Sequence, residues 1–273
     1  MQIVILTYES PQANTITHRL LTEYAHHVVG IVCSDTIIAG KTTWQSLRFL
    51  FSETGWGFVL PKGMEILLGR FAHLFVRYTG KKTSVPSLLD MGHEYHVPII
   101  KAKNVNKGKP FNTIKAWKPD LVISIYFNQL IRKKIINLPA QGVINIHPAL
   151  LPRNRGLFPY FWVLANGDAE TGVTIHWVDA KFDTGHILVQ EQFPVDHDDS
   201  VISLARKSAD IGAELLLKAV KLIESGNPPR MPQDSKQATY FSWPTPIDVH
   251  RFRKHGKRYG SILEIWHDLL VHC

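Results

Sequence analysis

The sequence predicts an α/β fold in which a mainly parallel sheet is flanked by helices. Residues 2–33 read as strand, helix and strand, which is the opening of a βαβ unit. After residue 97 short apolar runs again alternate with helical stretches, as far as residue 226. A chain of 273 residues is long enough to bury one such sheet between two layers of helices.

The opening unit consists of two apolar runs and one amphipathic helix. Residues 2–8 and 28–33 are apolar and rich in β-branched side chains, as expected of buried strands. Between them Ile16, Leu20 and Tyr24 recur at every fourth position, which predicts a helix.

The alternation stops between residues 36 and 86, where Trp, Phe and Leu are frequent. We expect a helical, aromatic-rich insertion here, because apolar residues gather on one helical face. They are Met64, Leu67, Leu68, Phe71, Leu74, Phe75 and Tyr78. Three interpretations stay open: this face packs against the core, lies on a membrane, or forms a wall of a substrate pocket.

The second half of the chain supplies the remaining elements. Strands are predicted at 97–100, 120–125, 142–147, 174–178 and 187–190, and helices at 111–117, 130–136, 158–166 and 199–224. We therefore expect one domain over residues 1–229. Residues 230–273 would form a short C-terminal extension that carries a basic run.

The composition is that of an ordinary globular protein, with 45% hydrophobic and 20% charged residues. Cys33 and Cys273 have neither disulfide nor metal spacing, which is typical of a reducing compartment. The first residues lack a basic leader, and no apolar run reaches the roughly 18 residues of a spanning helix. A cytoplasmic location is therefore expected.

The net charge of +8 favours an anionic ligand or surface. Nucleic acid is disfavoured as a partner, because the sequence has no aromatic-basic platform or binding motif. A metal site is also not expected. The run 93–96 places His93 and His96 three residues apart, whereas a helical zinc pair needs four.

Polar residues lie where the predicted strand 142–147 ends. Asn145 and His147 are one residue apart, so an extended backbone points both to the same side. Downstream, Asp183 begins an Asp-Thr-Gly turn. An amide that holds an oxyanion, an imidazole that moves a proton and a carboxylate that sets its charge are the parts needed for acyl transfer.

Three separated blocks then resemble the folate-dependent formyltransferases, the family that formylates Met-tRNA, glycinamide ribonucleotide and nucleotide-linked amino sugars. The blocks are 145–156 (Asn-Ile-His-Pro-Ala-Leu-Leu-Pro-Arg-Asn-Arg-Gly), 167–176 (Gly-Asp-Ala-Glu-Thr-Gly-Val-Thr-Ile-His) and 183–185 with Gln190. The resemblance is clear over roughly residues 97–226 and loose over the first 35. It does not extend to the insertion. It implies a Rossmann-like formyltransferase fold.

The resemblance also implies the reaction and its residues. Asn145, His147 and Asp183 match the family's catalytic residues, and 10-formyltetrahydrofolate would be the formyl donor to an amine, with no metal. Asn145 and a protonated His147 would stabilise the tetrahedral oxyanion, while Asp183 holds His147. The pterin would lie between two loops whose contacts are Tyr126, Phe127, Asn128, Leu130, Val178, Asp179 and Asp183.

The acceptor amine is inferred from the places where this sequence differs from the known enzymes of the family. The loop 7–12 is not the Gly-rich phosphate loop of the glycinamide ribonucleotide enzymes, which disfavours that substrate. About 45 residues follow Gly226, fewer than the β-barrel domain of the tRNA enzyme requires, so Met-tRNA is disfavoured. A small or carrier-attached amine, of the amino sugar or hydroxylamine type, is the expected acceptor.

Several alternatives stay open. They are a formyltetrahydrofolate hydrolase, a methionyl-tRNA formyltransferase and a non-catalytic membrane-associated binding protein. A lipid-linked acceptor at a peripheral membrane site would use the insertion and the basic tail. A homodimer through the 199–224 helix or the tail is a further alternative.

Overall fold

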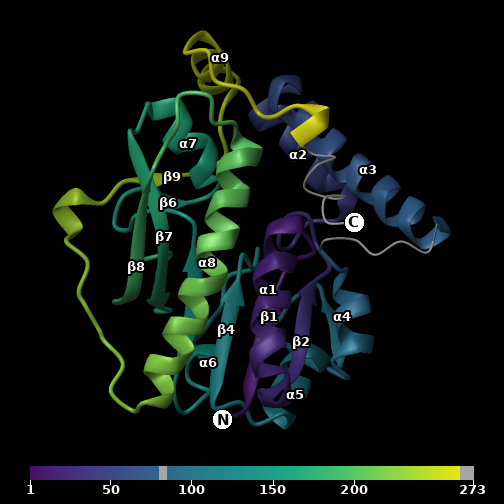
Figure 1. Cartoon of the computed structure of the whole chain (residues 1–273), viewed down its shortest axis with the longest axis vertical. Helices are drawn as coiled ribbons and strands as arrows, with labels where there is room; N and C mark the ends of the chain where they lie inside the picture. The colour runs from purple at the N-terminus through teal and green to yellow at the C-terminus, as the bar shows by residue number, and fades with distance from the viewer. Residues whose placement is uncertain (80–84, 265–273) are drawn as a thin grey trace.

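The computed structural model describes residues 1–79 and 85–264 and is built around one seven-stranded sheet (Figure 1). The strand order is β3-β2-β1-β4-β5-β7-β8, and the first five strands are parallel. β7 and β8 are antiparallel to their neighbours. The bounds are β1 Ile3–Thr7, β2 Val28–Ser34, β3 Ile99–Ala102, β4 Leu121–Ile125, β5 Val143–His147, β7 Glu170–Trp177 and β8 Ile187–Pro194. The predicted mainly parallel sheet is confirmed.

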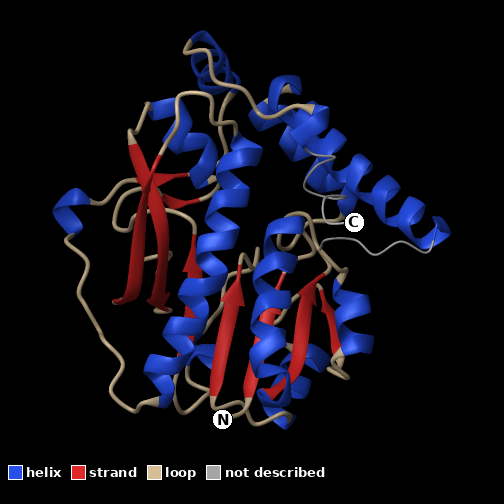
Figure 2. Ribbon diagram, in the orientation of Figure 1, coloured by secondary structure: helices blue, strands red, loops and turns tan. Residues whose placement is uncertain are grey.

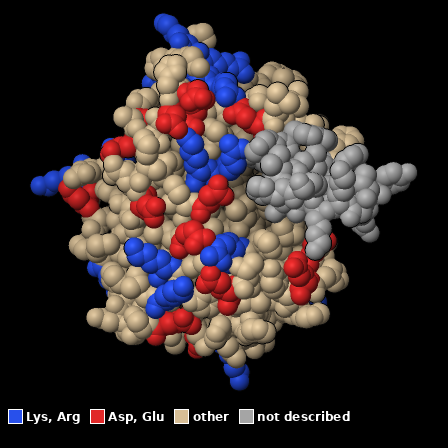
Figure 3. All heavy atoms as spheres, in the orientation of Figure 1, with Lys and Arg blue, Asp and Glu red and all other residues tan. Residues whose placement is uncertain are grey.

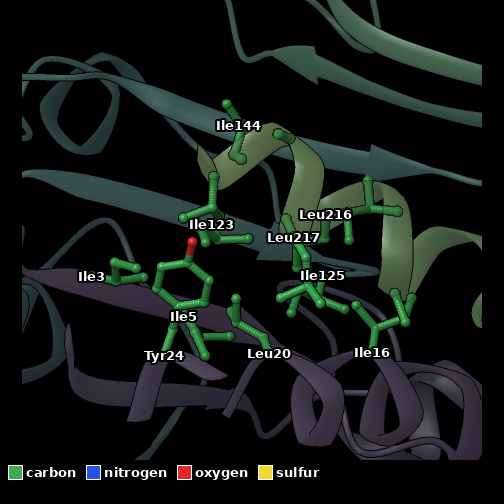
Figure 4. Packing of buried hydrophobic residues seen from close by; sticks show 14 of the residues in the cluster. Ile3, Ile5, Ile16, Leu20, Tyr24, Ile123, Ile125, Ile144, Leu216 and Leu217 are labelled. Atoms are coloured by element: carbon green, nitrogen blue, oxygen red, sulfur yellow. The ribbon is translucent and has the colours of Figure 1, made fainter. Parts of the chain in front are cut away.

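Helices cover both faces of this sheet (Figure 2). Ile3 and Ile5 of β1 pack towards α1 and α8, whereas Val4 and Leu6 pack towards α5 and α6, because successive side chains of a strand alternate. Figure 4 shows Leu216 of α8 together with Ile123, Ile125 and Ile144 in the core on the α1 and α8 side of the sheet. The helices are α1 Pro11–Tyr24, α4 Leu88–Glu94, α5 Gly108–Ala116, α6 Lys133–Ile136 and α8 Val201–Glu224.

The insertion is helical, as predicted, in its described part. α2 spans Thr43–Thr54 and α3 spans Trp56–Thr79, separated by Gly55 with a φ of 68°. Thr42 begins α2 with a capping box to Gln45. Residues 80–84 of the predicted 36–86 insertion lie outside the described residues.

One interpretation is that the apolar face of α3 packs against the core. It is wrong for three residues of that face, which are exposed. Met64, Leu67 and Phe71 are 41%, 56% and 63% exposed. The helix instead buries Phe58, which is 3% exposed and packs edge-on against Phe161. Leu74, Phe75 and Tyr78 of the predicted face have side chains outside the described part of the chain.

The described part of the C-terminal extension folds back onto the domain. β9 Tyr240–Phe241 pairs in parallel with β6 Arg155–Gly156, and α9 Pro246–Lys254 packs against α7 Pro159–Asn166. The short helix η2 Ser235–Gln237 lies before β9. The extension therefore lies directly on the loop that follows β5.

Several bounds differ from the sequence prediction. β3 begins at Ile99, two residues later than expected, just after Pro98. α6 begins at Lys133 and not at Leu130, because Leu130 and Arg132 instead hydrogen-bond the side chain of Asn106. α4 was not predicted, although Ser87 gives it a capping box.

Candidate active site

The site is built on one face of β5. Ile144 and Ile146 pack into the core beneath α8, so Asn145 and His147 point to the opposite face, as the sequence predicted. Sheet register then places Ser124 of β4 and His176 of β7 on either side of Asn145. A polar row therefore crosses three strands.

The Asn145 amide is bonded on both sides. The Ser124 hydroxyl donates to its Oδ1 at 2.7 Å, and its Nδ2 lies 3.1 Å from Nε2 of His176. Nδ1 of His176 lies 2.9 Å from the Trp177 carbonyl, which can only accept, so this nitrogen carries the proton. Nε2 of His176 then accepts from Asn145. Among the described residues, the second N–H of this amide has no protein acceptor.

His147 is 4% exposed and its tautomer is set by the backbone. Its Nε2 lies 2.8 Å from the Asn154 carbonyl and must therefore donate to it. The Nδ1 lone pair then faces Asp183, whose Oδ2 is 3.7 Å away. Asp183 reaches both imidazoles, since its Oδ1 lies 3.5 Å from Nε2 of His176.

Burial and neighbouring groups shift the pKa values of both His147 and Asp183. Burial lowers the pKa of His147 by more than Asp183 and the Asn154 carbonyl raise it. Burial alone would raise the pKa of the Asp183 carboxyl, but the positive charge of a protonated His147 or His176 ring and the Gly156 N–H, at 2.9 Å, favour the carboxylate and hold this pKa well below its usual range. The lowered pKa of His147 favours a neutral imidazole beside a carboxylate in the resting site. The protonated His147 predicted at the oxyanion belongs to a later stage of the reaction and stays a prediction.

The extension ties the two loops of the site together through Gln233. Its Nε2 donates to the carbonyls of Asp183 (2.9 Å) and Gly185 (2.7 Å), while its Oε1 accepts from Nη2 of Arg155 (2.6 Å). Thr239 accepts from the backbone N–H of Asn154 at 2.8 Å. The carbonyl that orients His147 and the turn that carries Asp183 are thus both held by residues beyond 230.

The loop after β4, predicted to contact the pterin, is bonded to its neighbours. Asn128 donates to the Thr36 carbonyl at 2.6 Å, and its Oδ1 is buried without a hydrogen-bond partner in the described structure. Tyr126 adopts a φ of 51°, Phe127 packs against the α5 and α6 core, and Leu130 is 36% exposed. Within the described residues, the Asn128 oxygen is therefore a buried acceptor that no donor satisfies.

The second predicted folate loop, residues 178–183, begins where β7 ends at Trp177. Val178 donates to the Val143 carbonyl at 2.8 Å. The Asp179 carboxylate closes its own turn by accepting from Thr184 Oγ1 at 2.7 Å. Asp183, at the end of this loop, adopts a φ of 54° and meets His147. Of this loop, Asp183 reaches His147, and the Asp179 carboxylate stabilises the turn.

Sequence reasoning missed His176 and Gln233 as parts of the site. His176 sits in a matched block, and its pairing opposite Asn145 could be found only by knowing that β7 runs antiparallel to β5. Gln233 has no local signal, because its partners are 48 or more residues away in sequence.

The described residues contain neither a metal-binding cluster nor a membrane-spanning helix. No group of three or more His, Cys, Asp or Glu side chains there could hold a metal ion, and His93 is exposed on α4. No described helix is both long and apolar enough to cross a membrane.

The family model described as formyl transferase matches residues 77–220, which is more than half of the chain. The chain belongs to the formyl transferase family. This range contains Asn145, His147, His176 and Asp183, and it begins within the insertion.

Among curated relatives, the methionyl-tRNA formyltransferase of Kosmotoga olearia is 37% identical over 161 residues. The match covers 59% of this chain and 52% of that protein. The chain therefore spans about half the length of the curated relatives it matches.

Two solved structures share the fold. A sugar 3N-formyltransferase, WlaRD, crystallised with dTDP and 5-N-formyl-THF, has a TM-score of 0.58 at 21% identity, covering 89% of this chain and 69% of its own. The N-formyltransferase of Helicobacter canadensis, in complex with folinic acid and dTDP-3-aminofucose, has a TM-score of 0.60 at 18% identity, covering 93% and 80%. The match confirms the predicted Rossmann-like formyltransferase fold.

Proposed function

We propose that the protein transfers a formyl group from 10-formyltetrahydrofolate to the amine of an amino sugar or a similar small or carrier-attached acceptor. The observation that carries this proposal is the convergence of Asn145, His147 and Asp183 on one sheet face within a chain of the formyl transferase family. These residues are our proposed catalytic group.

The proposed chemistry follows from the tautomers. The acceptor nitrogen bonds to the formyl carbon, and the Nδ1 lone pair of His147 takes the proton that this nitrogen loses. The free N–H of Asn145 donates to the oxygen that becomes negative. The bond from the formyl carbon to the folate nitrogen then breaks, and His147 returns the proton to that nitrogen. Asp183 and the Asn154 carbonyl stabilise the imidazolium between these steps.

The pterin would bind between the loop after β4 and the loop 178–183. The unpartnered Oδ1 of Asn128 supports this placement, because a buried acceptor without a donor is costly unless a ligand supplies one. Tyr126, Phe127, Leu130, Val178 and Asp179 would line the same site, mainly with backbone groups.

An amino sugar acceptor is supported by the fold match to enzymes crystallised with dTDP and dTDP-3-aminofucose. The loop after β1 carries Tyr8 and Glu9, and Glu9 Oε1 accepts from Asn14 and from the Leu88 N–H. That loop does not have the form of a Gly-rich phosphate cradle.

Met-tRNA is the second candidate acceptor. The 37% identity to a methionyl-tRNA formyltransferase supports it, although that match covers 52% of the relative. Because the two acceptors are very different in size, a direct assay separates them.

The test is tetrahydrofolate release from 10-formyltetrahydrofolate with and without amino-sugar nucleotides, hydroxylamines and Met-tRNA. Release that requires one amine and is lost in His147→Ala supports the transferase and identifies its acceptor class. Formate release without any amine would replace the proposal with a hydrolase. No release and no folate binding under any condition would reject both.

A further inference from the structure

Helix α3 carries an apolar ridge on its outer side. Trp56, Leu60, Met64, Leu67 and Phe71 recur every three or four residues and are 66%, 59%, 41%, 56% and 63% exposed. At 1.5 Å per residue the ridge is about 24 Å long. A contiguous exposed apolar surface of this length is a mark of an interaction site.

The opposite side of α3 anchors the helix to the protein. Phe58 is buried against Phe161, and Glu65 accepts from both Lys62 (2.9 Å) and Tyr259 (2.8 Å). The helix is therefore held by residues that are not part of the ridge. Substituting a ridge residue should leave these anchoring contacts in place.

A cleft of about 270 Å³ opens beside the ridge and shares Met64 with it. Its apolar lining includes Phe58, Pro61, Val249 and Phe252, and its rim carries three basic residues, Arg253, Lys257 and Arg258.

Two of the three rim cations keep their charge, whereas Arg258 forms an ion pair with the Glu264 carboxylate. Arg253 and Lys257 donate to the carbonyls of Gly57 and His197, each at 3.0 Å, and these carbonyls carry no net charge. Segment 246–258 contains five Lys or Arg residues and one Asp. Figure 3 shows Lys and Arg side chains gathered at the end of the molecule where α9 lies.

We propose that the α3 ridge and the basic end of α9 dock this protein on an anionic phospholipid membrane. An apolar ridge bordered by cations matches acyl chains beneath acidic headgroups. A second copy of this chain would match the ridge but would bring its own cations against these. Nucleic acid would match the cations but not the ridge. The proposal concerns membrane association and goes beyond the proposed function.

The test is sedimentation of the full chain with phosphatidylcholine vesicles, with and without phosphatidylglycerol. We expect binding only to the acidic vesicles, and loss of that binding at high salt. Leu67→Glu should weaken partition about tenfold or more. Arg253→Gln and Lys257→Gln should each weaken it about fivefold.

Leu89→Glu is the matched control, because Leu89 is 63% exposed on α4, away from the ridge. It should bind as the unsubstituted protein does. The proposal is overturned if the protein does not bind acidic vesicles, or if Leu89→Glu loses as much vesicle binding as Leu67→Glu. A stable dimer that Leu67→Glu dissociates, seen by analytical ultracentrifugation, would assign the ridge to a second copy and also overturn it.

Discussion

Polar residues are usually exposed and apolar residues are usually buried. The loops around His147 and the outer side of α3 depart from this rule in opposite ways. At His147, polar and ionised groups are buried but bonded: Asp183 accepts from Gly156, and the Asn154 carbonyl accepts from the imidazole. On α3, apolar side chains are exposed. A stable fold requires neither arrangement, so each is best explained by what it binds. The first suits a reaction and the second an interface.

The largest expected effect is at the buried polar site. His147→Ala removes the proposed proton acceptor and should lower turnover by about 10²- to 10⁴-fold. The measurement is acceptor-dependent tetrahydrofolate release. His93→Ala is the control, because His93 is an exposed histidine on α4, and it should retain full activity. Equal rates in the two variants would remove His147 from the mechanism.

The next comparison is between two phenylalanines. Phe161 is 1% exposed, so Phe161→Ala should lower the free energy of unfolding by about 3–5 kcal/mol. Phe71 is 63% exposed, and Phe71→Ala should change it by less than about 0.5 kcal/mol. Denaturant titrations of both variants measure this. A large loss in Phe71→Ala would mean that the ridge contributes to folding.

A smaller effect is expected where the extension supports the site. Gln233→Ala removes the bonds to Asp183, Gly185 and Arg155 and should lower kcat about tenfold to a hundredfold, with less change in KM. Gln233→Glu retains the acceptor for Arg155 but lacks the donors, so it should not restore the rate. Gln237→Ala is the control, because the Gln237 amide donates to the nearby Asp234 carboxylate and, among the described residues, does not bond to the site. An unchanged kcat in Gln233→Ala would show that the turn holds itself.

The smallest expected effect is on stability against pH. Burial lowers the folded pKa of His147 below the ordinary 6.5, so the unfolded chain takes up the proton first. The contribution of neutral His147 to the free energy of unfolding is thus fully present above pH 6.5. It is lost as the pH falls towards the pKa of His147 in the folded protein. Between about pH 7.5 and about pH 5.5, the free energy of unfolding should fall by more in the unsubstituted chain than in His147→Asn. An equal decrease would contradict a buried neutral imidazole.

Part of the site was predictable because its signal is local. Asn145 and His147 lie two residues apart on an apolar strand, and strand periodicity alone puts them on one side. The contact of His147 with Asp183 was predicted only through a family resemblance. His176 and Gln233 were not predicted, since their partners come from distant segments.

By itself the sequence determined the sheet, the helical insertion and the face of β5 that carries the polar residues, because these follow from periodicity and capping. The tertiary structure alone decided the charge of His147, the orientation of α3 and the role of the extension. The charge follows from burial beside Asp183, the orientation from the anchors at Phe58 and Glu65, and the role from Gln233 bridging two loops. These depend on which distant groups meet, and no local pattern encodes that.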